Sequence, residues 1–110
     1  MATFQLTKSE AEELGNFQSG STTFGPLTIT WNIDITIPQI VVDATLLGVS
    51  IGHAVINKDN PSVTLGGSIG IFTAKATINA DFDKRQLMYD VDVRSFGHTV
   101  VKKSGILVSW

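Results

Sequence analysis

Hydrophobic and polar residues alternate without a break from residue 27 to residue 37. The apolar positions are Leu27, Ile29, Trp31, Ile33, Ile35 and Ile37. The polar positions between them are Thr28, Thr30, Asn32, Asp34 and Thr36. A period of two is typical of a β-strand with one buried face, and the many β-branched residues favour a strand over a helix. We therefore predict a half-buried strand over 27–37, ended by Pro38, which has no amide proton to donate.

Residues 40–56 are apolar at both odd and even positions. This pattern predicts a strand covered on both faces, or one that passes from one surface to another, with Gly48 and Gly52 favouring a bend. The cover could be a second copy of the chain, an apolar ligand inside a barrel, or the N-terminal segment. Self-association is the simplest of these, because homo-oligomers are common and need no internal cavity.

The remaining chain also reads as strands and turns. Residues 57–61 have the composition of a turn, and a further strand is expected over 63–73. Residues 74–96 predict a hairpin with its connection at 83–86, in which Ala80 faces Tyr89 and Ile78 faces Val91. A final strand is expected over 98–110, with a possible bulge at Gly105 and with Lys102 and Lys103 discouraging edge-to-edge pairing.

A short internal repeat flanks the predicted turn, because residues 47–52 and 65–70 both read Leu-Gly-x-Ser-Ile-Gly. No helix is expected after either copy, which argues against a phosphate-binding loop. We interpret the two copies as paired strands whose glycines allow sharp coiling or the close approach of another backbone.

The N-terminal region is the exception to the strand pattern. Thr7 and Glu10 fit a capping box and Gly15 a helix stop, so 8–14 predicts a short helix. The fold class expected is all-β, an antiparallel β-sandwich or flattened β-barrel of about six to eight strands with a short N-terminal helix. We expect one domain over 1–110, with helix and loop in 1–26 and the β-sheet core in 27–110.

Composition narrows the possible functions. The chain has 110 residues, of which 43% are hydrophobic and 16% charged, and this composition predicts a single folded domain. Eight Lys and Arg against ten Asp and Glu, without a basic run, argue against a nucleic-acid partner. The chain has no cysteine, so disulfides and thiolate metal sites are excluded. No cofactor is expected.

No transmembrane segment and no secretory signal are expected. Polar residues interrupt the apolar stretch 40–56, which is shorter than the roughly 20 residues of a spanning helix. The start of the chain lacks a basic patch followed by an apolar run. The location of the protein is therefore left open. The chain could be cytoplasmic, could be already processed, or could be exported by a non-classical route.

Candidate chemistry is sparse. His53 and His98 are the conventional general-base candidates, and neither has a partner at a spacing that implies a triad. A polar cluster of Asn79, Asp90 and Asp92 could in principle hold Ca²⁺. Lysine and arginine nearby favour a solvated charged face instead, so no catalytic residue and no metal site is predicted.

The polar face of the first strand is the candidate binding face. It comprises Thr28, Thr30, Asn32, Asp34 and Thr36. Its hydroxyl groups could bind carbohydrate, ice or a partner strand, or could simply be the wet side of a sheet. The function we expect is a non-catalytic binding or assembly protein that self-associates through apolar sheet surface. One alternative is a small β-barrel holding an apolar ligand or lipid, and a second is an enzyme using His53 with an acidic partner.

Overall fold

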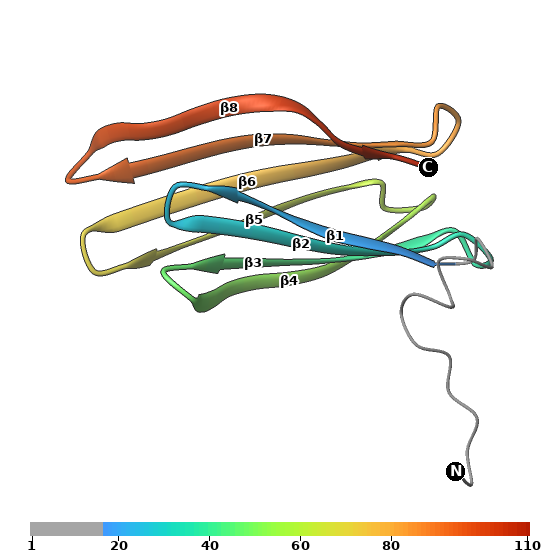
Figure 1. Ribbon diagram of the computed structural model, residues 1–110, viewed down its shortest axis with the longest axis horizontal. Coiled ribbons are helices and arrows are strands. Elements are labelled where there is room, and N and C mark those ends of the chain that lie inside the picture. Colours follow the sequence, from blue (N-terminus) through green and yellow to red (C-terminus); the bar gives the residue numbers. More distant parts are fainter. Residues whose placement is uncertain (1–16) are drawn as a thin grey trace, which may run out of the picture.

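A computed structural model describes residues 17–110, and within that range the chain is entirely β-strands and turns. Eight strands form two antiparallel four-stranded sheets that pack as a β-sandwich (Figure 1). The strands are β1 (Phe17–Phe24), β2 (Leu27–Asp34), β3 (Gln39–Leu46), β4 (Val49–Asn57), β5 (Ser62–Ile69), β6 (Phe72–Asp81), β7 (Gln86–Ser95) and β8 (His98–Ser109). The all-β prediction is confirmed. The helix expected at 8–14 lies outside the described residues.

Each sheet is a simple meander, because strands that follow one another in the chain are neighbours. The first sheet has the order β1-β2-β3-β4 and the second β5-β6-β7-β8. The predicted turn at 57–61 connects them. Its geometry is held by the side-chain oxygen of Asn57, which accepts hydrogen bonds from the backbone amides of Asp59 at 3.0 Å and Asn60 at 2.8 Å.

Strand β2 confirms the alternation but is shorter than predicted. Leu27, Ile29, Trp31 and Ile33 are buried. The strand ends at Asp34, four residues before Pro38, because the Asp34 carboxylate accepts a hydrogen bond of 2.9 Å from the amide of Thr36 and starts a turn. Ile37 therefore leaves the core and is 58% exposed.

The prediction of one strand over 40–56 was wrong, because this segment is a hairpin. Leu47 and Gly48 form a two-residue turn with φ of 53° and 79°, both left-handed. Leucine is unusual in such a turn, where asparagine and glycine are preferred. The turn could therefore not be recognised from its residue types. On β3 the even-numbered residues from Ile40 to Leu46 are buried and Val41 is half-buried, whereas Val55 on β4 is exposed. The odd-numbered apolar residues therefore lie on the outer face, in the turn or beside the bulge of β4.

Three further boundaries differ from the prediction. Residues 17–24, expected as part of the N-terminal loop, form strand β1 of the first sheet. The strand expected over 63–73 contains a turn at Gly70 and Ile71 that separates β5 from β6. In the next hairpin Ala80 pairs with Leu87 and Ile78 with Tyr89, two residues away from the predicted register.

The connection of that hairpin explains the shifted register. It is 82–85, because the Asp81 carboxylate accepts hydrogen bonds from the amides of Asp83 and Lys84 at 3.1 and 2.9 Å. A shift of two residues preserves which side chains face inward, so the predicted faces still hold.

Strand β8 is an edge strand, so Lys102 and Lys103 lie where they discourage edge-to-edge pairing. Its bulges lie at Val100 and Leu107, the residues that the pairing with β7 skips, and not at the predicted Gly105. Gly105 instead faces the ring of Tyr89, since a Cβ built on it would lie 3.4 Å from the Tyr89 hydroxyl.

The repeated Leu-Gly-x-Ser-Ile-Gly segments meet across the sandwich. The expectation that they form paired strands was wrong, because β4 and β5 belong to different sheets. The close approach was predicted correctly. A Cβ on Gly52 would lie 2.9 Å from Leu65, and one on Gly67 would lie 3.1 Å from Ile51. Each copy thus supplies a glycine that makes room for an aliphatic side chain of the other, and the sheets close tightly here.

Candidate functional site

The outer face of the first sheet carries three of the five residues of the candidate binding face. Thr28, Thr30 and Asn32 alternate with the buried residues of β2 and point outward. Asp34 ends the strand, and Thr36 lies in the following turn, so these two do not continue the face. Cross-strand pairing adds hydroxyls from β1, and the Oγ1 atoms of Thr23 and Thr28 lie 3.4 Å apart. The result is a flat, hydroxyl-rich surface.

The same face brings together a histidine and a carboxylate that the sequence left apart. Asp43 on β3 pairs with His53 on β4, and Nδ1 of His53 lies 2.5 Å from Oδ1 of Asp43. The contact depends on the hairpin turn at 47–48, which sequence analysis missed. The two side chains are 61% and 46% exposed. The carboxylate orients the imidazole, but so open a pair does not exclude water from a reacting group.

Replacing His53 by alanine is expected to lower the free energy of unfolding by less than about 1 kcal/mol, because exposed ion pairs contribute little. Urea denaturation of His53→Ala beside the parent chain measures the difference. A loss of several kcal/mol would show that this pair is a structural element of the sheet.

The predicted polar cluster on the second sheet is divided among different neighbours. Asn79 stands opposite Met88, and Asp90 opposite Thr77. Asp92 receives two hydrogen bonds from Arg94, of 3.2 Å from Nε and 3.1 Å from Nη2.

The charges around Asp92 disfavour a cation. The bonds from Arg94 hold the pKa of Asp92 below its usual value despite partial desolvation, and Lys102 and Lys75 act in the same direction. Among residues 17–110 no three His, Asp, Glu or Cys side chains are grouped as metal ligands. This surface is therefore a charged face with an excess of cations around one carboxylate.

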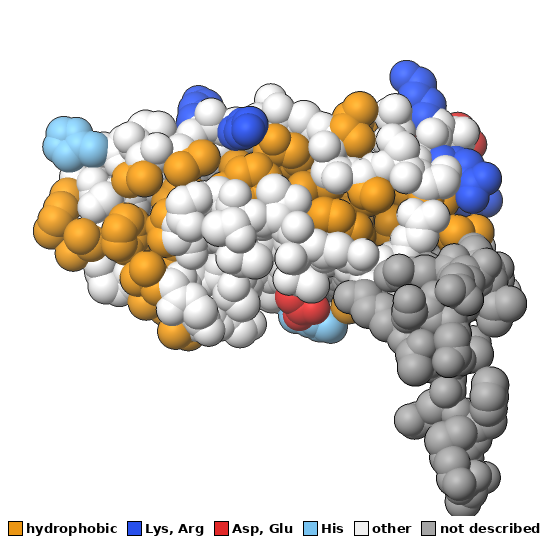
Figure 2. All heavy atoms as spheres, in the orientation of Figure 1, with side chains coloured by type: hydrophobic (Ala, Val, Ile, Leu, Met, Phe, Trp, Pro, Cys, Tyr) orange, Lys and Arg blue, Asp and Glu red, His pale blue; other side chains and the backbone are white. Residues whose placement is uncertain are grey.

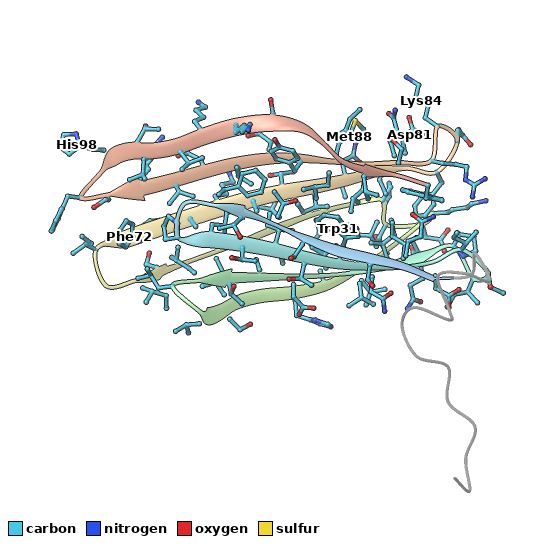
Figure 3. All side chains as sticks on the ribbon, viewed as in Figure 1. Trp31, Phe72, Asp81, Lys84, Met88 and His98 are labelled. Atoms are coloured by element: carbon cyan, nitrogen blue, oxygen red, sulfur yellow. The ribbon has the colours of Figure 1, made fainter. Side chains whose placement is uncertain are left out.

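The two ends of the sandwich differ in chemistry. Figure 3 shows His98 at one end and Asp81 and Lys84 at the other. At the latter end a hollow of about 210 Å³ opens beside the edge-to-face pair of Phe82 and Trp110, whose centroids are 5.9 Å apart. It is lined by Ile33, Asp34, Ile35, Pro38, Lys58, Phe82, Arg85 and Trp110.

The opposite end is apolar, and sequence analysis did not identify it. Four two-residue turns project there, at 25–26, 47–48, 70–71 and 96–97, and Figure 2 shows hydrophobic side chains gathered on that end. The exposed apolar residues of these turns and the adjoining strands are Leu47, Val49, Ile71, Phe96 and Val100. We call this surface the apolar turn end. The available signal was a large apolar residue followed by glycine, at 47–48 and 96–97, in the position of a hairpin turn.

No segment of the described chain forms a helix long and apolar enough to cross a bilayer. Comparison with known proteins finds no matching family model, no matching curated protein and no matching solved structure.

Proposed function

We propose that this chain is a non-catalytic assembly protein that associates with copies of itself through the free edge of β1. The single observation that carries the proposal is that β1 lacks the features that protect sheet edges. Its eight residues, Phe17–Phe24, contain no charged side chain and no proline. Among the described strands its only neighbour is β2, and their pairing runs without a bulge. Such an edge is a template for another strand.

Two of the other three edges of the sandwich, β8 and β4, differ from β1. The third, β5, also lacks charge, proline and bulges, but it packs against β4 of the first sheet through Leu65 and Gly67. Strand β8 carries Lys102 and Lys103 and two bulges, and Lys103 pairs with the inward-facing Val91, so its charge lies on the inner face. Strand β4 has a bulge in its pairing with β3. Lysines, inward charges and bulges are the usual means of preventing edge pairing. Their absence from β1 favours its use as a contact.

Antiparallel pairing of β1 with its symmetry mate is the simplest geometry. A two-fold axis near the middle of the strand, at Ser21, would join two four-stranded sheets into one continuous sheet of eight strands. The hydroxyl-rich faces of the two copies would then continue into each other. Because β1 has no charge, such pairing brings no like charges together along the strand.

Packing within the sandwich favours assembly over an internal apolar ligand. The inner faces meet directly: Leu65 occupies the space beside Gly52, and Ile51 lies against Gly67. The enzyme alternative is the weaker one, because Asp43 and His53 stand in the open on a flat face. The apolar contact surface envisaged from the sequence is replaced in this proposal by a backbone edge, since the outward-facing residues of β2 are polar and Asp43 and His53 lie on the same outer face.

Light scattering of the full chain at micromolar concentrations tests the proposal. We expect the parent chain to be a dimer and Ser21→Lys to weaken the association about tenfold, because two lysines would face each other at the symmetry axis. Ser104→Lys is the matched control, because Ser104 is exposed on the edge strand β8. A monomeric parent chain, or equal weakening by both substitutions, would contradict the proposal.

A further inference from the structure

We propose that the apolar turn end docks onto a lipid surface that carries anionic head groups, with its turn side chains inserted at the interface. This inference does not depend on self-association through β1. It rests on the conformation of the turns, on the absence of charge within them, and on the cations that stand behind them.

Two turns place a large apolar side chain where it is costly. Leu47 and Phe96 each occupy a left-handed position with φ of 53°, followed by Gly48 and Gly97 at 79°. Left-handed geometry favours glycine or asparagine and disfavours bulky residues. Phe96 is moreover 77% exposed, so burial does not offset the cost. The same exception to local preference occurs twice at one end of the molecule, and such exceptions concentrate at functional sites.

The turns at this end contain no Asp, Glu, Lys or Arg. Residues 47–50, 69–72 and 95–98 are apolar, glycine, serine or histidine. The opposite end is different, because its turns 58–61 and 82–85 carry Lys58, Asp59, Asp83, Lys84 and Arg85. Figure 1 places the turns that join β1 to β2, β3 to β4, β5 to β6 and β7 to β8 at the same end, away from these charged turns. One end of the molecule is thus suited to water and the other to an apolar medium.

Cations stand on the second sheet behind the apolar turn end. Arg94 is two residues before Phe96, and Lys75 and Lys102 both pair with Asp92, one outward position further from the turn. Outward positions on a strand are spaced by about 7 Å, so these charges lie roughly 7–14 Å behind the turn. Together with Lys103, which pairs with Val91, these cations outnumber the carboxylates of Asp92 and Asp90. Charges at this depth meet the head groups when apolar side chains enter the interface by about 5–10 Å.

The charge distribution favours a lipid surface over a second copy of the chain. Two copies that met through their apolar turn ends would bring two sets of like charges toward each other. An anionic surface, by contrast, is complementary both to the apolar turns and to the cations behind them.

Sedimentation of the full chain with vesicles tests this inference. We expect binding to phosphatidylcholine vesicles that contain phosphatidylserine, weaker binding to phosphatidylcholine alone, and a further loss as salt is raised. Phe96→Asn and Leu47→Asn should each weaken vesicle binding at least about tenfold, because a buried apolar side chain is lost. Asparagine accepts the left-handed conformation, so neither variant should lose stability in urea denaturation.

Ile37→Asn is the matched control, since Ile37 is an exposed apolar turn residue at the charged end. It should bind vesicles as the parent chain does. Failure of the parent chain to bind, or equal losses in the Phe96 and Ile37 variants, would overturn the inference. So would an oligomer, seen by light scattering without lipid, that Phe96→Asn dissociates and Ser21→Lys does not, because the occupant would then be a second copy. Loss of dimers in Ser21→Lys with vesicle binding retained would leave both proposals standing.

Discussion

Replacing Leu46 by alanine is expected to lower the free energy of unfolding by about 2–5 kcal/mol. Leu46 is the last residue of β3 and is fully buried between the sheets. Its removal would leave a cavity that the surrounding strands cannot fill without moving. Since a domain of this size is stable by only about 5–15 kcal/mol, the loss would shift the urea midpoint clearly.

The neighbouring residue provides the control. Leu47 has the same side chain but lies in the hairpin turn and is 52% exposed. Leu47→Ala should therefore change the free energy of unfolding by about 0.5 kcal/mol or less. Similar losses in both variants would contradict the hairpin turn, because a strand covered on both faces would bury both leucines.

Replacing Gly52 by alanine is expected to destabilise the sandwich by about 1–3 kcal/mol through overpacking. The added methyl group would lie 2.9 Å from Cβ and Cδ2 of Leu65, closer than such atoms approach each other. This cost is specific to the contact between β4 and β5. In an ordinary strand position, replacing glycine by alanine would be neutral or favourable, because it restricts the unfolded chain.

A double-mutant cycle tests the contact itself. Leu65→Ala alone should cost about 2–5 kcal/mol, because a buried side chain is removed. In that background Gly52→Ala should cost less, since Cγ and Cδ2 of Leu65 are removed and only its Cβ, 2.9 Å away, still crowds the new methyl group. The coupling between the two sites should therefore be about 1–3 kcal/mol in urea denaturation. Additive losses would mean that Gly52 and Leu65 do not face each other.

The limits of sequence-based prediction are visible in the turns. The 57–61 turn was recognised because Asn57, Asp59, Asn60 and Pro61 are common turn residues. The turn at Leu47 and Gly48 was missed because leucine reads as a strand residue, and two strands were joined into one. The ion pair of Asp43 and His53 was lost with it, because only the hairpin places those residues opposite each other.

Of the candidate site, the sequence predicted the outward face of β2 from its alternation alone, as far as Asp34. It did not predict the apolar turn end. The residues of that end come from three hairpins far apart in the chain, and no single window contains them. The sequence also could not show which strands lie at the edges of the sheets, because edge position depends on the pairing between strands.

The sequence by itself determined that this is an antiparallel β protein and which side of β2, β6 and β7 is buried, because a period of two is a local property of the chain. Only the tertiary structure decided where the chain reverses within residues 40–56, in which register β6 pairs with β7, and that Leu65 packs against Gly52. These features depend on free energies shared between distant segments. The structural role of a glycine, or of a leucine in a left-handed turn, cannot be inferred until the residue opposite it in the fold is known.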